Sequence, residues 1–111
     1  MKIKTESKTI NFKTSKRYEL ATRYDTRQSF YGKAFIEEDK QENIILKSYD
    51  TIVLYISKEK EIYINKDIEE DLLYSNTTQR HIKETIKQFT ERGALTKKDL
   101  LKLPDFKVLV L

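Results

Sequence analysis

Apolar and polar residues alternate with a period of two over much of the first two-thirds of the chain, which is the pattern of half-buried strands. This alternation marks residues 8–13 and 17–22. Further strand-like runs are residues 34–37, 44–49, 51–56 and 61–65, of which 44–49 and 51–56 are rich in β-branched and aromatic residues. Most of the polar turns between them are short, whereas parallel strands need a crossover of about a dozen residues or more. The pattern therefore predicts an antiparallel sheet of four to six strands.

The apolar period changes to that of a helix in the last third of the chain. Ile82, Ile86 and Phe89 recur at i, i+4 and i+7, so they form one stripe on a helix. We expect this stripe to pack on one face of the sheet. The sheet residues expected to contact it are Ile52, Leu54, Ile62 and Ile64.

Polar residues mark the two ends of this main helix. Asn76 is a suitable N-cap, and Gln79 follows three residues later, as in a capping box. Gly93 is placed to end the helix as a residue with left-handed backbone. These signals predict a helix over residues 77–92.

A second start signal follows at once. Thr96 with Asp99 three residues later predicts the cap of a short helix that Pro104 closes. Residues 105–111 are strand-like and apolar, and a free tail of that composition would aggregate, so we expect it on a sheet edge or in a homodimer interface. The predicted fold class is α+β, with one antiparallel sheet, one main C-terminal helix and one short helix.

Length and composition exclude several classes of protein. A chain of 111 residues fits a single domain, residues 1–111. It has no cysteine, which removes disulfides and thiolate metal sites, and no apolar run of the roughly 18 residues that a membrane span needs. Its two glycines stand apart, so neither a P-loop nor a dinucleotide fingerprint is present. We expect a cytoplasmic protein with no cofactor, as a monomer or homodimer.

Charge is divided unevenly along the chain. Residues 1–33 carry nine Lys or Arg and three Asp or Glu, a net charge of +6, and residues 72–111 carry eight and four, a net charge of +4. The middle, residues 34–71, has five and eleven, a net charge of −6. This is either an ordinary mixed surface or a basic face built from both ends of the chain, able to meet nucleic acid or an acidic protein.

The segment 24–33 concentrates tyrosine, phenylalanine and basic residues in one polar stretch. Tyrosine and arginine are the residues that binding hot spots favour, and they also suit base stacking with phosphate contacts. The alternative is a structural loop whose aromatic residues cover the edge of the core and in which Gly32 supplies a special backbone angle. The expected solvent-facing, partner-binding patch comprises Arg23, Tyr24, Arg27, Tyr31 and Lys33.

Arg80 and His81, at the start of the main helix, are expected to adjoin this patch. Free backbone N–H groups there could hold an anion, or the polar residues could serve only as caps. On the wet side of the helix Arg80 can pair with Glu84 at i, i+4. His81 is the single histidine, and no paired carboxylate or nucleophile accompanies it in the sequence, so we expect no catalytic site.

The acidic run of Asp67, Glu69, Glu70 and Asp71 matches no metal-ligand loop, so we expect a solvated turn there and no metal site.

Three segments carry a family resemblance: residues 24–34 (YDTRQSFYGKA), 46–53 (LKSYDTIV) and 74–84 (YSNTTQRHIKE), with Gln88 after the last. Together they resemble a small domain family of unknown function that recurs in phages and plasmids of Gram-positive bacteria. The resemblance runs from about residue 17 to residue 102. Some proteins with similar segments resemble anti-CRISPR proteins that block type II effector nucleases.

Two functions from different classes are therefore expected. The resemblance implies a mobile-element protein that binds and inhibits a host defence nuclease, as an anti-CRISPR against a Cas9-type effector does. The basic ends instead favour a nucleic-acid-binding accessory protein of a phage or plasmid. The two differ in salt dependence, because phosphate contacts make affinity for bare DNA fall steeply as salt is added.

Overall fold

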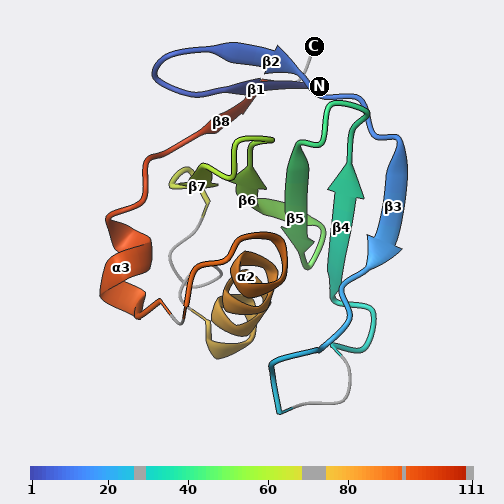
Figure 1. The fold of residues 1–111 in the computed structure, drawn as a ribbon, viewed down its shortest axis with the longest axis vertical. Coiled ribbons are helices and arrows are strands. Elements are labelled where there is room, and N and C mark those ends of the chain that lie inside the picture. Colours follow the sequence, from blue (N-terminus) through green and yellow to red (C-terminus); the bar gives the residue numbers. More distant parts are fainter. Residues whose placement is uncertain (27–29, 69–74, 94, 110–111) are drawn as a thin grey trace.

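The computed structural model describes residues 1–26, 30–68, 75–93 and 95–109, and it has the predicted α+β architecture (Figure 1). The strands are β1 (Lys2–Lys4), β2 (Thr9–Asn11), β3 (Lys16–Glu19), β4 (Ala34–Glu38), β5 (Ile44–Ser48), β6 (Thr51–Ile56), β7 (Ile62–Ile64) and β8 (Lys107–Leu109). The helices are α2 (Asn76–Phe89) and α3 (Lys97–Leu101).

Five strands form the antiparallel sheet that the sequence predicts. Their order is β3-β4-β5-β6-β7, so each strand pairs with its neighbour in the chain. Short turns join β4 to β5, β5 to β6 and β6 to β7, and each returns the chain alongside the strand it has just left. The longer segment 20–33 joins β3 to β4. We call this the large sheet.

A second, smaller sheet was not predicted. It has the order β2-β1-β8, with both pairings antiparallel, and it joins the beginning of the chain to residues 107–109. The expected docking of the C-terminal tail on a sheet edge is confirmed for these three residues, and residues 110–111 lie outside the described part. Pairing between the two ends of a chain leaves no local pattern, so the sequence could not reveal it.

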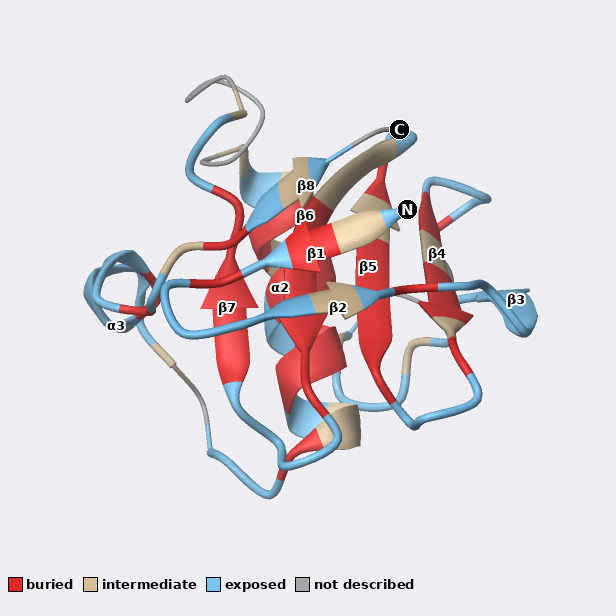
Figure 2. Cartoon of the chain, turned by 90° about the horizontal axis from the view of Figure 1, so that it is seen from above, coloured by how far each residue is buried: buried red, intermediate tan, exposed pale blue. Residues whose placement is uncertain are grey.

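The small sheet and α2 cover opposite faces of the large sheet (Figures 1 and 2). On the face toward the small sheet, Ile45, Tyr55 and Tyr63 lie side by side on β5, β6 and β7 and pack with Ile3 and Phe106. The Tyr55 and Tyr63 rings stack at 5.4 Å between centroids. The part of the large sheet formed by β5, β6 and β7 is therefore buried on both faces, whereas β3 at its edge is exposed. The fold has three layers.

The opposite face holds the main core against α2. Ile82 and Ile86 are buried there with Leu54, Ile62 and Ile64, and Phe89 packs at the margin, as predicted. Ile52 was expected in the same group, but it packs against the other cluster. Leu46 pairs with Leu54 and Lys47 with Ile52, so β6 has a bulge at Val53. A bulge inserts one residue and reverses the alternation of faces beyond it.

The ends of α2 differ from the prediction. Ser75, rather than Asn76, is the N-cap, and its side chain accepts a hydrogen bond from the Thr78 N–H. The helix ends at Phe89, and Thr90 follows in extended conformation with its N–H on the Ile86 carbonyl. Gly93 lies beyond the end and lacks a positive φ, so the predicted glycine cap is wrong. The Thr90 N–H thus provides the hydrogen bond that the Ile86 carbonyl of the last turn needs, before the chain reaches Gly93.

The capping box of α3 is confirmed. The Thr96 hydroxyl accepts from the Asp99 N–H, and the Asp99 carboxylate accepts from the Thr96 N–H, which lowers the pKa of Asp99. No described helix is long and apolar enough to cross a membrane.

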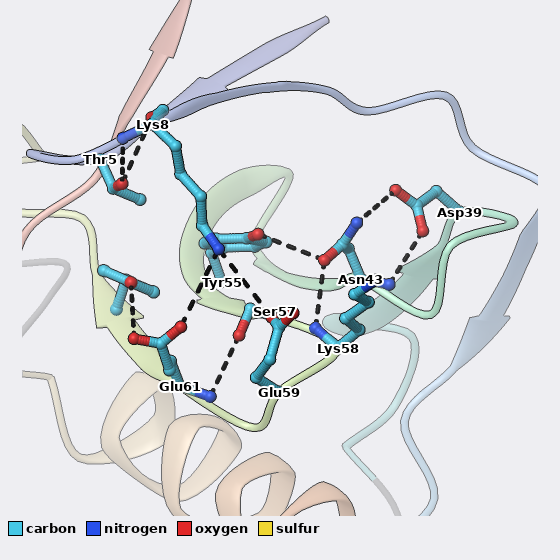
Figure 3. Close-up of polar contacts among 10 residues, drawn as sticks. Thr5, Lys8, Asp39, Asn43, Tyr55, Ser57, Lys58, Glu59 and Glu61 are labelled. Atoms are coloured by element: carbon cyan, nitrogen blue, oxygen red, sulfur yellow. Dashed lines mark hydrogen bonds and ion pairs between the residues drawn. The ribbon is translucent and has the colours of Figure 1, made fainter.

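A polar network joins the turns at one end of the two sheets (Figure 3). Asn43 Oδ1 accepts hydrogen bonds from the Tyr55 hydroxyl at 3.3 Å and the Lys58 N–H at 3.2 Å, and Asn43 Nδ2 donates to Asp39 at 2.9 Å. The ammonium of Lys8, from the β1–β2 hairpin, lies 3.9 Å from the carboxylate of Glu59. This network helps to fix the small sheet on the large one.

Candidate functional site

The three segments that carry the family resemblance meet at α2, around His81. Ser48, at the end of β5, contacts His81 Nδ1 at 2.8 Å and the Thr78 hydroxyl at 3.1 Å. The Phe30 ring meets the imidazole edge-on at 4.5 Å, and Tyr49 lies 6.1 Å from it. Residues far apart in the sequence therefore form one cluster whose centre is a histidine.

His81 and Ser48 are both fully buried. A serine hydrogen-bonded to a histidine is the geometry of an activated nucleophile, but here no solvent path reaches either side chain. The pair instead fastens the β5–β6 turn to the first half of α2. His81 was expected to adjoin the solvent-facing patch, but it is buried, because the helix turns the imidazole toward the sheet.

Glu84 holds the segment that follows β3 against the helix. Its Oε1 atom accepts three backbone hydrogen bonds, from the N–H groups of Arg23 at 3.1 Å, Tyr24 at 2.9 Å and Asp25 at 2.9 Å. The side chain is only 3% exposed. Glu84 therefore does not form the predicted i, i+4 pair, and Arg80 lies 3.5 Å from Asp25 instead.

Gln88, one helical turn after Glu84, adds contacts to the same segment. We call the hydrogen bonds that Glu84 and Gln88 make to this segment the clasp. Gln88 Nε2 donates to Glu84 Oε2 at 2.9 Å and to the Ala21 carbonyl at 2.6 Å. Thus His81, Glu84 and Gln88 all serve to bring the other two segments onto α2. These motif residues have a structural explanation.

Two tight turns lie side by side near the start of α2. Tyr31 and Gly32 have φ of 52° and 70°, and the Lys33 N–H donates to the Phe30 carbonyl at 3.1 Å. Tyr49 and Asp50, between β5 and β6, have φ of 51° and 65°. Two successive positive φ angles are the signature of the type I′ turn. The Tyr49 N–H donates to the Lys33 carbonyl at 2.9 Å and so joins the two turns.

Each of these turns places a tyrosine where asparagine, aspartate or glycine is the usual choice. Left-handed backbone is uncommon for a bulky residue and carries strain. Tyr31 is nevertheless 75% exposed and Tyr49 is 45% exposed. The Tyr49 ring lies near His81 on one side and has the Lys33 ammonium 5.8 Å from its centre, but much of its surface stays exposed. The exposed parts of the two rings are candidates for contact with a partner.

A row of cations borders the same region. Arg80, Lys83 and Lys87 recur at i, i+3 and i+7 on α2, and the Lys87 ammonium lies 4.9 Å from the centre of the Tyr24 ring. Among the described residues, no carboxylate oxygen lies within 4.0 Å of the ammonium of Lys83 or Lys87. Tyr24 is 56% exposed.

Three shallow hollows adjoin one another along this row. The first, about 320 Å³, lies beside the first turn of α2 and includes Arg80 and Lys83. The second, about 150 Å³, shares these two residues and adds Tyr24 and Lys87 together with the acidic Asp25 and Glu84. The third, about 560 Å³, shares Tyr24 and Lys87 and continues past the end of the helix. We call this series the α2 groove.

Most of the described residues of the predicted patch are exposed. Arg23, Tyr24, Tyr31 and Lys33 face solvent, and Arg80 is partly exposed at the adjoining groove. Arg27 lies outside the described residues. One part of the structural reading of the segment 24–33 is confirmed, because Gly32 does supply a positive φ. The partner-binding reading stays a prediction.

Sequence reasoning missed Tyr49, Lys83 and Lys87. The helical spacing of the two lysines from Arg80 was a usable signal, since i, i+3 and i+7 share one helix face. Tyr49 had a weaker one, because a Tyr-Asp pair between two strand-like runs marks a two-residue turn.

The described residues contain no group of three or more histidine, cysteine or acidic side chains that could hold a metal ion. Of the acidic run considered above, Asp67 is exposed and residues 69–71 lie outside the described part. Glu37 contacts the Lys47 ammonium at 2.6 Å. Burial alone would raise the pKa of Glu37, but hydrogen bonds from Lys47 and Thr14 outweigh it and lower that pKa.

A family model decides the classification. The chain belongs to a family of unknown function, DUF8033, whose model matches residues 18–102. This range includes all three segments that converge on His81, and nearly the whole range expected from the resemblance. No curated protein and no solved structure matches the chain.

Proposed function

We propose that this protein binds a single strand of nucleic acid along the α2 groove. The observation that carries the proposal is the row of Arg80, Lys83 and Lys87 along the α2 groove, with the exposed ring of Tyr24 beside it. Tyr31 and Tyr49 add two further exposed rings in the turns near the start of the helix. Sequence-tolerant single-strand binding uses these two elements, aromatic rings on which bases stack and a basic groove that follows the backbone.

The spacing of the cations suits an extended chain of phosphates. The helix rises about 1.5 Å per residue, so Arg80 and Lys87 are roughly 10 Å apart along its axis. Lys83 lies between them and has no described carboxylate within 4.0 Å, whereas Arg80 lies 3.5 Å from Asp25. Tyr24 borders the same stretch, where a stacked base would gain about 1–3 kcal/mol.

Two features favour this role over a purely structural one. The clasp made by Glu84 holds the backbone beside Tyr24 in place, so that ring is pre-positioned. The left-handed turns hold Tyr31 and Tyr49 outward despite the strain of that backbone. Strained, exposed residues cluster at binding sites more often than elsewhere on a surface.

The test is fluorescence anisotropy with a labelled 15-nucleotide single strand, as DNA and as RNA. The variant Lys83→Gln/Lys87→Gln should lose at least tenfold in affinity, and its plot of log affinity against log salt should be shallower by about 1.4, since each contact contributes about 0.7. Lys16→Gln/Lys98→Gln is the matched control, because both lysines are exposed away from the groove. Tyr24→Leu should weaken binding about tenfold with little change in the salt slope.

Failure of the parent protein to bind either strand at low salt would overturn this proposal, as would equal losses in the lysine variant and its control. Inhibition of a host defence nuclease, expected from the resemblance, remains a prediction. A Cas9-type effector carries a guide RNA and a displaced strand that a strand-binding face could contact. Titration of cleavage by purified type II effectors tests it, and inhibition that survives Lys83→Gln/Lys87→Gln would assign it to another surface.

A further inference from the structure

A second basic surface lies on the opposite side of the molecule. The small sheet buries Ile3 and half-buries Ile10 and Val108 on its inner face. Because strand residues alternate in direction, Lys2, Lys4 and Lys107 fall on the outer face, where Thr9, Asn11 and Leu109 complete the described strand positions. We call this the lysine face, and it contains no acidic strand residue.

The lysines are held close together by strand pairing. Lys4 and Lys107 are direct partners across β1 and β8. Residues opposite each other in an antiparallel pair have Cβ atoms about 4.5–5.5 Å apart, and like charges there are unfavourable. Lys2 is on the same face of β1, two residues from Lys4.

Carboxylates contact the neighbouring Lys8, but none of the described carboxylates contacts these three lysines. Lys8, in the hairpin after β1, lies within 4.0 Å of Glu59 and Glu61 (Figure 3). No described carboxylate lies within that distance of Lys2, Lys4 or Lys107. Lysines from both ends of the chain therefore lie together on one face without an ion pair to a described carboxylate.

We propose that the lysine face is a second binding surface, which contacts the phosphates of duplex nucleic acid. A flat face without exposed aromatic rings offers charge and hydroxyl or amide groups, which suit phosphate oxygens and not base stacking. The proposal stands independently of the α2 groove. The large sheet separates α2 from the small sheet (Figures 1 and 2). If both proposals hold, one molecule therefore binds a single strand on the α2 side and a duplex on the small-sheet side.

The test uses a 20-base-pair duplex and the variant Lys2→Gln/Lys4→Gln/Lys107→Gln. Its duplex affinity should fall at least tenfold at 100 mM salt, and its salt slope should be shallower by about 2–3, since each phosphate contact contributes about 0.9. The matched control is Lys16→Gln/Lys40→Gln/Lys98→Gln, which removes three exposed lysines elsewhere and should lose less than threefold. The variant should melt no earlier than the parent, because the Lys4–Lys107 repulsion is removed.

A bridging assay separates this proposal from the preceding one. A bead-tethered single strand should capture a labelled free duplex only when the parent protein is present. The lysine-face variant should keep its single-strand affinity, and Lys83→Gln/Lys87→Gln should keep its duplex affinity. Equal duplex affinity in the lysine-face variant and the control would overturn the proposal. So would loss of duplex binding through the groove variant alone, or binding of the lysine face to an acidic protein but to no duplex.

Discussion

Replacement of Glu84 by glutamine tests how the binding side of the molecule is assembled. One carboxylate oxygen of Glu84 accepts three backbone N–H groups at 2.9–3.1 Å, and the side chain is 3% exposed. Glutamine has nearly the same shape but no charge. In one orientation its amide N–H₂ faces the three backbone N–H donors. In the other orientation the N–H₂ faces Gln88 Nε2, which donates to Glu84 in the parent protein. In each orientation donors face donors.

The magnitude follows from the contacts. A hydrogen bond to a charged group contributes about 1.5–3 kcal/mol net, and contributions that share one acceptor do not add. We therefore expect Glu84→Gln to lower the free energy of unfolding by about 2–3 kcal/mol, out of a total of about 5–15 kcal/mol for a domain. For a chain of this length the melting temperature should fall by roughly 10 °C.

Urea denaturation supplies the free energy, and Glu91→Gln is the matched control. Glu91 lies just after the same helix, is exposed, and undergoes the same loss of charge. Amide hydrogen exchange adds a local measurement, since the N–H groups of Arg23, Tyr24 and Asp25 should lose protection in Glu84→Gln only. If the two variants unfold within about 0.5 kcal/mol of each other and these three amides stay protected, the clasp contributes nothing and the reasoning is refuted.

Three further predictions concern stability. Ile86→Asp should abolish cooperative unfolding, because Ile86 is 1% exposed beneath the sheet and a buried unpaired charge costs several kcal/mol; a melting curve close to that of the parent would contradict the core assignment. The lowered pKa of Glu37 means that its contribution is complete above the unfolded value of about 4.5 and is lost as pH falls through the folded value. The stability advantage of the parent over Glu37→Gln, measured by urea denaturation, should therefore shrink between pH 6 and pH 3, and an advantage independent of pH would argue against the Lys47 contact. Tyr49→Asn should keep or raise the melting temperature, since asparagine tolerates the φ of 51°, while weakening single-strand binding at least fivefold; a clear drop in melting temperature would make the tyrosine structural.

Only the tertiary structure decided which polar side chains face inward. Glu84 was expected on the wet side of the helix and His81 beside the exposed patch, yet both are buried. Their partners lie in segments up to 61 residues away, and hydrogen bonds to those segments offset the loss of hydration. Such partners leave no periodic signal in the sequence.

The sequence by itself determined the elements that depend on local patterning. Alternation, β-branched and aromatic composition and short turns predicted six of the eight described strands and their antiparallel order. Thr96 with Asp99 predicted the cap of α3. All of these features rest on neighbouring residues. The tail strand was expected only as a tail docked on a sheet edge, and β1 was not expected at all. Long-range pairing decided the division into two sheets and the bulge that redirects Ile52. It also brought lysines from both ends of the chain together on the lysine face. Short strands gain too little from their own residues to form alone, so the packing of the whole chain selects their partners.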